Sequence, residues 1–251
     1  MHTSHFFKIL CILQGKSKEA HVTEKPVIDA AKAAAMVKPG DVVHIGGFLG
    51  CGSPDSIIAE LVKLGTNKLT LVCNDTAVLD EKNNRITGVA PLIKARAFNR
   101  VIVSHIGTNP ETQRQMNEGE TEVTLVPQGT LAERIRAAGA GLGGILTPTG
   151  VGTEVELGKQ KIVVGDRIYL LEEALPGDVA LIKAKKADKA GNLVFSKTAR
   201  NFNPLMAMAC KLVIVEVEEL VEIGSIDPDM VHCPCIFVDY IVMSKAQGGK
   251  K

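Results

Sequence analysis

Short apolar runs alternate with amphipathic stretches along the chain from residue 27 onward. The runs are rich in β-branched residues and bounded by turn residues, so they predict buried strands. They occupy residues 42–45, 68–73, 100–104, 122–126, 177–184, 191–195, 211–217 and 235–242. The amphipathic stretches predict helices at residues 27–38, 55–64 and 130–138. Strands that alternate with helices indicate βαβ units, so we expect an α/β fold with an open, largely parallel sheet and helices on both faces.

One departure from the parallel pattern is expected in the segment QKIVVGDRIYLLE (160–172), where Gly165 and Asp166 predict the turn of a hairpin. The sequence contains no internal repeat and no obvious linker, so residues 27–243 are expected to form a single domain. Residues 1–26 are interpreted as a disordered extension, with a targeting segment as the alternative, and residues 244–251 as a flexible tail.

Composition narrows the function classes. The 251 residues carry a net charge of +1 and only 4% aromatic side chains, so neither nucleic acid nor a membrane is expected as a partner. Six scattered cysteines suit reduced core thiols in a cytoplasmic protein. The cluster HCPC (232–235) has no second cluster to complete a tetrahedral site, so no metal is expected.

The stretch GGFLGCGSPD (46–55) follows the first predicted strand directly. Ser53 is expected as the N-cap of the next helix, with Pro54 at its first position and Asp55 in its first turn. A strand-to-helix turn rich in glycine can hold an anion on its backbone N–H groups, or it can simply permit close packing. The sequence leaves both interpretations open.

A second glycine stretch, GAGLGG (139–144), formally matches the dinucleotide fingerprint through Gly139, Gly141 and Gly144. It follows a predicted helix instead of a strand and does not lead into a helix. A nicotinamide cofactor is therefore not expected.

Polar residues stand where several predicted strands end. These residues are Asn74, Asp75, Ser104, His105 and Gln128, together with the segment TARNFNP (198–204). In an open α/β sheet, ligands bind beyond the carboxyl ends of the strands, so we expect an amide-lined site suited to carbonyl oxygens. No nucleophile flanked by a base is evident, and His44, inside a strand, is interpreted as a core residue.

The motifs DVVHIGGFLGCGSP (41–54), LTLVCND (69–75), VPQGTLAERIRAAGAGLGG (126–144) and ARNFNP (199–204) resemble those of the family I coenzyme A transferases. The resemblance covers residues 27–242 and is strongest to the α subunits of this family, of the acetate-, butyrate- and acetoacetate-transferring type. It implies a fold of the CoA-transferase and NagB-RpiA-like type. It also implies an enzyme in which a glutamate of the partner β subunit, in a Ser-Glu-Asn-Gly motif, attacks the acyl-CoA thioester. That motif is absent from this sequence.

The resemblance assigns Gln128 to the oxyanion hole and Asn74 to the neighbourhood of the glutamate. It places Gly46, Gly47 and Phe48 at the cleft. It further places Gly139, Gly141 and Gly143 near the acyl pocket. It implies an α2β2 assembly whose ligands are acyl-CoA and short-chain carboxylic acids, with coenzyme A as a substrate and no other cofactor.

Two alternatives remain open at this stage. A non-catalytic ligand-binding or sensor protein could use the same fold, and a self-sufficient hydrolase or isomerase would need a nucleophile that the sequence does not reveal. The segment KNNRITGV (82–89) is longer than the family pattern leads us to expect, which leaves acyl-chain preference open.

Overall fold

The computed structural model describes residues 23–245. The predictions made for residues 1–22 and 246–251 therefore lie outside the described residues. At the described ends, Lys25 N donates to Lys189 O, and Ser244 Oγ donates to Glu216 Oε1. Residues on both sides of 27–243 thus also bond to the folded body, and the domain bounds stay a prediction.

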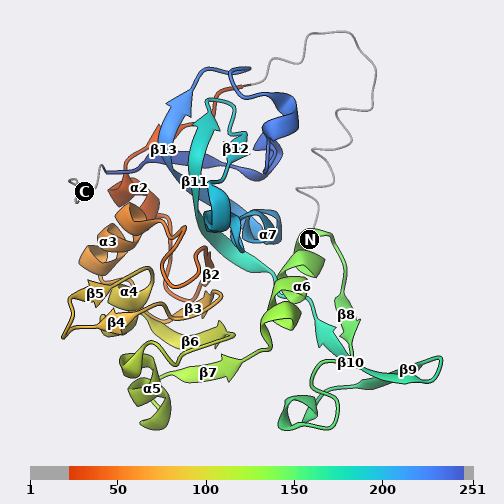
Figure 1. Ribbon diagram of the computed structural model, residues 1–251. Helices are drawn as coiled ribbons and strands as arrows, with labels where there is room; N and C mark the ends of the chain where they lie inside the picture. Colours follow the sequence, from red (N-terminus) through yellow and green to blue (C-terminus); the bar gives the residue numbers. More distant parts are fainter. Residues whose placement is uncertain (1–22, 246–251) are drawn as a thin grey trace.

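A sheet of nine strands forms the centre of the molecule (Figure 1). Its strands are β1 (Val27–Ile28), β2 (Val42–Ile45), β3 (Leu69–Val72), β6 (Phe98–Val103), β7 (Glu122–Leu125), β11 (Gly177–Asp188), β12 (Leu193–Val194), β13 (Cys210–Val221) and β14 (Tyr240–Met243). The order β1-β14-β13-β11-β2-β3-β6-β7 is parallel throughout, and β12 pairs antiparallel with β11. The predicted open and largely parallel sheet is confirmed.

Helices cover both faces of this sheet, as predicted. The longer ones are α2 (Ala30–Ala35), α3 (Asp55–Leu64), α4 (Ala90–Lys94), α5 (Pro110–Asn117), α6 (Gln128–Gly139) and α7 (Asn203–Ala209). Successive strand residues point to opposite faces. Leu181 joins the core under α2, α3 and α4, whereas Ala180 and Ile182 join the core under α6 and α7. Two apolar cores therefore hold the sheet between its helical layers.

Some predicted elements were wrong in type or extent. Residues 27–28 form a strand instead of the first turn of a helix, because they pair with Ile241 and Val242 at the edge of the sheet. The helix begins only at Ala30. Asp29 is its N-cap residue, and its side chain accepts a hydrogen bond from Lys32 N at 2.6 Å. In the segment 235–242, only the residues from Tyr240 onward are in a strand. Helices α4, α5 and α7 were not predicted.

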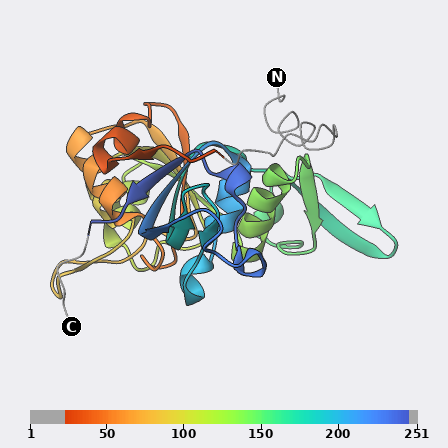
Figure 2. The same cartoon turned by 90° about the horizontal axis from the view of Figure 1, so that it is seen from above.

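A small arm projects from the body beside α6 (Figure 2). It is a three-stranded antiparallel sheet formed by β8 (Gly144–Thr147), β10 (Arg167–Glu173) and β9 (Lys161–Val164) in that order. The predicted hairpin is confirmed as β9–β10, with Gly165 at a positive φ of 59° in the turn. The remaining pair, β4 (Leu79–Asp80) and β5 (Arg85–Ile86), forms a short hairpin within the long segment near Asn74.

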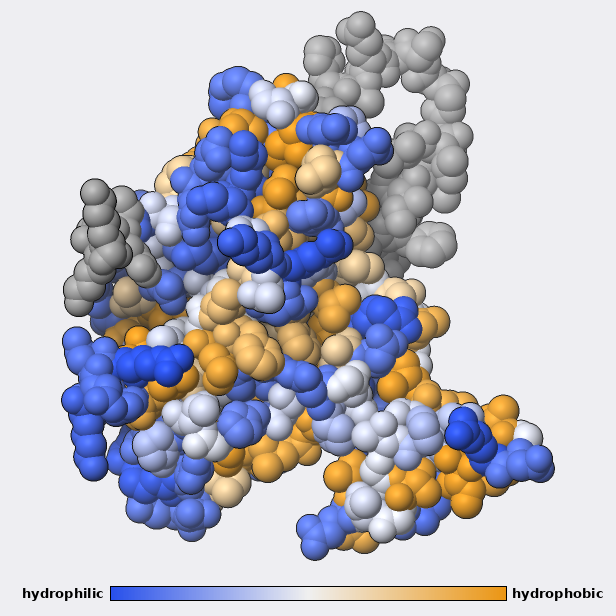
Figure 3. Space-filling view, viewed as in Figure 1, coloured by the Kyte–Doolittle hydropathy of each residue, from blue (hydrophilic) through white to orange (hydrophobic). Residues whose placement is uncertain are grey.

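The arm has an inner face toward α6 and an outer face away from it. Residues opposite each other in antiparallel strands share a face. Register therefore places Leu146, Ile162, Val164, Tyr169 and Leu171 together on the outer face. Leu146 and Val164 remain 42% and 53% exposed. Figure 3 shows apolar side chains gathered on the arm and a hollow between the arm and the body. None of the helices among residues 23–245 is long and apolar enough to span a membrane.

Candidate active site

Gln128 occupies the first position of α6, directly after Pro127 and the end of β7. Its side-chain Nε2 donates to Asn74 Oδ1 at 2.7 Å, across 54 residues of sequence. A carboxamide has two N–H donors, so this bond leaves one donor of Gln128 available to a ligand. The structure therefore brings together two of the residues that the sequence placed at strand ends.

Asn74 follows β3 and is almost fully buried, at 1% exposure. Its Nδ2 donates to Asp75 Oδ2 at 2.5 Å, while its Oδ1 accepts from Gln128. Ser104 Oγ donates to the backbone oxygen of Asn74 at 2.7 Å. These partners fix which end of each amide is the donor, because a flipped Asn74 would point its donor at Gln128 and its acceptor at a carboxylate.

The Asp75 carboxylate fixes the orientation of the Asn74 amide. Its carboxylate accepts from Leu49 N at 3.0 Å and from Ala77 N at 2.7 Å, in addition to Asn74. The sequence placed Asp75 at a strand end but did not assign it to the site. Its role depends on Leu49, which lies 26 residues earlier with a positive φ of 49°, and no sequence pattern signals that contact.

The backbone N–H groups of residues 46–49, at the start of the glycine stretch, are already used within the chain. Gly46 N donates to Leu181 O, Gly47 N to Asn201 Oδ1, Phe48 N to Cys51 O and Leu49 N to Asp75. None of these four donors is left for an anion. For residues 46–49 these bonds favour close packing, and a ligand-binding role of Gly46, Gly47 and Phe48 remains a prediction.

Two glycines in this stretch are required by their neighbours. A Cβ on Gly46 would overlap the Asn203 carboxamide, and a Cβ on Gly47 would overlap the Ser53 hydroxyl, at a φ of +130°. The side-chain amides of Asn201 and Asn203 therefore hold the turn in place, and a role of the segment 198–204 in lining a ligand site remains a prediction. Phe48 projects from the same turn and is 44% exposed.

The N-terminus of α3 is occupied by a carboxylate of the protein itself. Glu216 on β13 is fully buried and accepts from Ser56 N at 2.8 Å, from Ser56 Oγ at 3.0 Å and from Ile57 N at 3.3 Å. The prediction that Ser53 caps this helix was wrong, since Pro54 is the N-cap residue and makes no side-chain cap bond. The Glu216 carboxylate, at the positive end of the helix dipole, takes the place of a side-chain cap.

The ionisable groups around Gln128 hold the structure in place through hydrogen bonds and burial. The Cys73 thiol is buried, which raises its pKa well above the usual range, and it donates to Asp75 O. The Asp75 carboxylate is held by three donors, so it is not poised for attack. His44 is fully buried in β2, as the core interpretation predicts, and burial lowers its pKa to about 4. The described residues near Gln128 can therefore stabilise charge on an oxygen, but they offer no activated nucleophile.

A sequence model of one family, described as Coenzyme A transferase, matches residues 27–244. The chain belongs to the coenzyme A transferase family.

Its relatives support this assignment. The acetate CoA-transferase subunit alpha of Escherichia coli (strain K12) is 48% identical over 213 residues, which are 85% of this chain and 94% of that protein. The acetoacetyl-CoA:acetate/butyrate CoA transferase alpha subunit of Clostridium acetobutylicum is 46% identical over 212 residues, which are 84% and 94% of the two chains.

The fold agrees with solved structures of such enzymes. An acyl-CoA transferase apoenzyme of Escherichia coli O157:H7 superposes with a TM-score of 0.77 at 20% identity, over 94% of this chain and 50% of that chain. The likeness at this identity concerns the fold, and it agrees with the CoA-transferase type of sheet that the resemblance implied.

The glycines that the CoA-transferase resemblance placed near an acyl pocket lie away from Gln128. Gly139 ends α6, and Gly141 and Gly143 follow in the turn to β8. Gly139 lies eleven positions after Gln128 on this helix, or roughly 16 Å along the axis. A Cβ on Gly139 would meet the Met208 backbone, so this glycine serves the close approach of α6 to α7. A substrate role for these glycines remains a prediction.

The HCPC cluster is engaged in local structure. His232 Nδ1 accepts from Phe195 N at 3.0 Å, and burial raises the pKa of the Cys233 thiol to about 12. Within residues 23–245, no group of three or more His, Cys, Asp or Glu side chains is arranged to hold a metal ion.

Proposed function

We propose that this chain is the α subunit of a CoA-transferase that moves CoA between a short-chain acyl-CoA and a carboxylic acid of the acetate, butyrate or acetoacetate class. In this proposal a β subunit supplies the nucleophilic glutamate from a Ser-Glu-Asn-Gly motif, and the two chains assemble as α2β2. Coenzyme A is a substrate, no other cofactor takes part, and the enzyme works in the cytoplasm.

The observation that carries the proposal is the Gln128–Asn74 contact. In the proposed reaction, a carboxylate oxygen of the β subunit attacks the thioester carbon, and the carbonyl oxygen gains negative charge. The second N–H of Gln128 donates to this oxygen, while Asn74 and Asp75 hold the amide in place. Collapse of the tetrahedral intermediate breaks the C–S bond, expels CoA as the thiolate and leaves an acyl-glutamyl anhydride.

The later steps regenerate the free glutamate carboxylate of the β subunit. The CoA thiolate attacks the glutamyl carbonyl of the anhydride, releases the first acid and forms a glutamyl-CoA thioester. The second carboxylic acid attacks that thioester to form a new anhydride, and the thiolate then attacks its acyl carbonyl. This gives the new acyl-CoA and the free glutamate. The first and the last attack develop charge on the acyl carbonyl oxygen, so the same positioned donor serves both of them.

Two further observations support a partner subunit. The relatives reported above are named as α subunits. In addition, the outer face of the arm exposes apolar side chains such as Val164, and a sheet normally buries such a face against another layer. The arm contacts α6 through β8, and its outer face is the side that α6 leaves uncovered. We assign the β subunit to this face.

The alternative of a non-catalytic sensor on the same fold predicts ligand binding without a partner. The backbone donors of residues 46–49 and the N-terminus of α3 would be a natural anion site of such a sensor, and both are occupied by groups of the chain. No observation favours this alternative.

The test is to produce the chain alone, with a candidate β subunit, and with the same β subunit carrying Gln in place of the motif glutamate. CoA transfer from acetyl-CoA to butyrate and acetoacetate is then measured. We expect transfer only in the intact pair. Transfer by the chain alone would overturn the division of roles, and full activity of the Gln-substituted pair would overturn the assigned nucleophile.

A further inference from the structure

The tip of the glycine turn, residues 48–51, is closed by two backbone bonds. Phe48 N donates to Cys51 O at 3.0 Å, and Cys51 N donates to Phe48 O at 2.8 Å. Both central residues have a positive φ, 49° at Leu49 and 88° at Gly50, as in a type I′ turn, which favours Asn and Gly at these positions. Leucine is strained in this conformation, and such strain persists only where the surroundings impose it.

Leu49 is held at both of its backbone polar groups. Its N–H donates to the Asp75 carboxylate, at 3.0 Å from Oδ2. Its carbonyl oxygen accepts from Thr87 Oγ1 at 3.1 Å. Thr87 Oγ1 in turn accepts from Val78 N at 3.2 Å, so this hydroxyl acts as donor and acceptor at once. The turn tip is thereby fixed between the Asp75 carboxylate and the Thr87 hydroxyl.

Thr87 packs directly against the turn tip. A Cβ on Gly50 would lie 2.5 Å from the Thr87 Cβ, and a Cβ on Gly88 would lie 3.0 Å from the Gly50 Cα. The two glycines therefore permit the close approach that brings the Thr87 hydroxyl to Leu49. Thr87 follows β5 directly, in the segment 82–89, whose role the sequence left open. The end of this segment supports the glycine turn.

A continuous series of hydrogen bonds leads from the turn tip to Gln128. Asp75 Oδ2 accepts from Leu49 N and also from Asn74 Nδ2, the latter at 2.5 Å. Asn74 Oδ1 then accepts from Gln128 Nε2 at 2.7 Å. Asn74 and Asp75 are 1% and 5% exposed, so water is kept from the bond between them. A shift of the turn tip therefore changes how the carboxylate holds the Asn74 amide, and with it the direction of the Gln128 donor.

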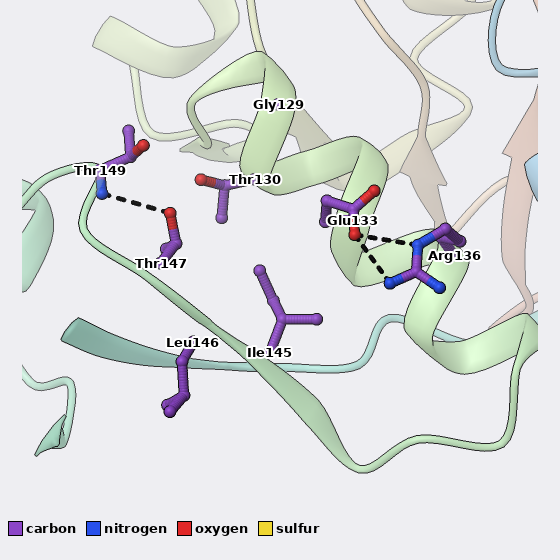
Figure 4. A pocket seen from close by; sticks show the side chains of 8 residues that line it. All are labelled: Gly129, Thr130, Glu133, Arg136, Ile145, Leu146, Thr147 and Thr149. Atoms are coloured by element: carbon purple, nitrogen blue, oxygen red, sulfur yellow. Dashed lines mark hydrogen bonds and ion pairs between the residues drawn. The ribbon is translucent and has the colours of Figure 1, made fainter. Parts of the chain in front are cut away.

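The side of α6 that faces the arm gives the Gln128 amide no such support. A cavity of about 510 Å³ lies there, between the helix and the arm (Figure 4). The residues of α6 that line it are Gly129, Thr130, Glu133 and Arg136, and Gln128 is not among them. Within residues 23–245, the bond to Asn74 is the only hydrogen bond of the Gln128 side chain. The orientation of this donor thus depends on the series that begins at the turn tip.

We propose that the Thr87 hydroxyl is a positioning group for the oxyanion donor and acts on Gln128 through the turn tip at Leu49. This inference rests on the proposed function, in which the second N–H of Gln128 donates to the thioester oxygen. Thr87 itself touches no reacting atom. Loss of its hydroxyl releases the strained Leu49 and turns the Gln128 donor away from the oxyanion. The chemical step then slows, while the residues that bind substrate stay in place.

The first test is Thr87→Val in the complex with the β subunit, which removes the hydroxyl and keeps the shape of the side chain. We expect kcat for CoA transfer from acetyl-CoA to butyrate to fall by about 3- to 10-fold with KM nearly unchanged, as for one lost hydrogen bond that serves the transition state. Thr87→Ser keeps the hydroxyl and should restore most of the activity. Thr121→Val is the matched control, because the Thr121 hydroxyl also donates to a backbone oxygen at 3.1 Å, that of Phe98, outside this series. A wild-type kcat in Thr87→Val would overturn the assignment.

A double-mutant cycle separates positioning from general damage to the site. If Thr87 acts through Gln128, Thr87→Val should lower kcat by less than about twofold in a complex that already carries Gln128→Ala. Damage that reaches the reaction by another route would multiply the two losses. A double variant whose loss equals the product of the single losses would therefore overturn the proposal.

A further readout does not depend on turnover. The side-chain amide resonances of Gln128 are identified in the ¹⁵N-labelled chain by comparison with Gln128→Ala. We expect Thr87→Val to shift these resonances and Thr121→Val to leave them in place. Shifted resonances in a protein that transfers no CoA would leave the positioning standing while the proposed function fails. Unshifted resonances in a complex whose turnover depends on Gln128 would overturn the positioning alone.

Discussion

Gln128 and Asn74 meet end to end, with the amide nitrogen of one 2.7 Å from the amide oxygen of the other. Asn74 in turn donates to Asp75, whose carboxylate is fixed by two backbone N–H groups. The second donor of Gln128 is thereby oriented before any substrate arrives. Such preorganisation is what makes a donor effective in stabilising an oxyanion.

Gln128→Ala removes this donor. We expect kcat of the complex to fall by at least about tenfold, and by up to about 10³-fold if Gln128 is the main donor to the oxyanion. Thermal unfolding should change little, because Gln128 is exposed. Gln113→Ala is the control, since the side chain of that glutamine donates to Ile106 O, away from Asn74. A Gln128→Ala complex with wild-type turnover would remove Gln128 from the mechanism.

Gly46→Ala tests the close approach of Asn203 to the glycine turn. The added methyl overlaps a fully buried carboxamide that also accepts from Lys183 N at 3.0 Å, so the turn cannot yield without breaking that bond. We expect a loss of about 1–3 kcal/mol in the free energy of unfolding, measured by chemical denaturation. Gly143→Ala, where a Cβ meets nothing within 4 Å, should leave stability nearly unchanged. Equal stabilities of the two variants would contradict this packing argument.

His44 makes stability depend on pH. Burial lowers its pKa in the folded protein to about 4, and the nearby Asp178 carboxylate opposes this only in part. An unfolded chain protonates the same ring near pH 6.5. Below that pH the unfolded state binds the extra proton, so stability falls as the pH drops from about 6.5 to about 4. The loss attributable to His44 is on the order of 3 kcal/mol.

His44→Gln should flatten this part of the curve of unfolding free energy against pH. The control is His105→Gln, which removes an exposed imidazole and should leave the curve in place. The curves are compared by urea denaturation at fixed temperature. An unchanged slope between pH 6.5 and 4 in the His44 variant would show that burial does not keep this ring neutral.

Val164→Lys tests the outer face of the arm as the binding surface for the β subunit. A charge on this 53% exposed valine would have to be desolvated in the interface, so we expect the affinity for the β subunit to fall by at least about tenfold. Analytical ultracentrifugation of the mixed subunits measures the change. Ile86→Lys, at a 41% exposed position on β5, controls for added charge alone. If both variants assemble like the wild type, the partner binds elsewhere.

The central sheet could be predicted from the sequence because its signals are local. The runs at residues 42–45 and 211–217 are apolar and β-branched, and each became a buried strand. Gly65 ends α3 in the left-handed conformation, as a glycine at that position predicts. Helix α5, by contrast, is strongly polar, and only Thr112 and Gln115 of its residues are buried. It therefore has no apolar stripe from which the helix could be predicted.

The site could be predicted only in part. Gln128 and Asn74 stand at strand ends, where topology brings polar residues together. The cap of α3 could not be predicted, because Glu216 follows Ser56 by 160 residues and lies in an ordinary strand pattern. The sequence also did not predict that the backbone donors of residues 46–49 are already bonded within the chain. They depend on Asn201, whose side chain reaches Gly47 from 154 residues later in the chain.

These long separations also order events during synthesis. Residues 46–57 leave the ribosome about 150 residues before Asn201, Asn203 and Glu216, the side chains that hold the glycine turn and cap α3. At typical translation rates this delay lasts roughly 8–30 s. For that interval the nascent chain carries apolar strands, but the side chains that hold the glycine turn have not yet emerged. These apolar strands are therefore exposed to aggregation until the last fifth of the sequence emerges and completes the turn.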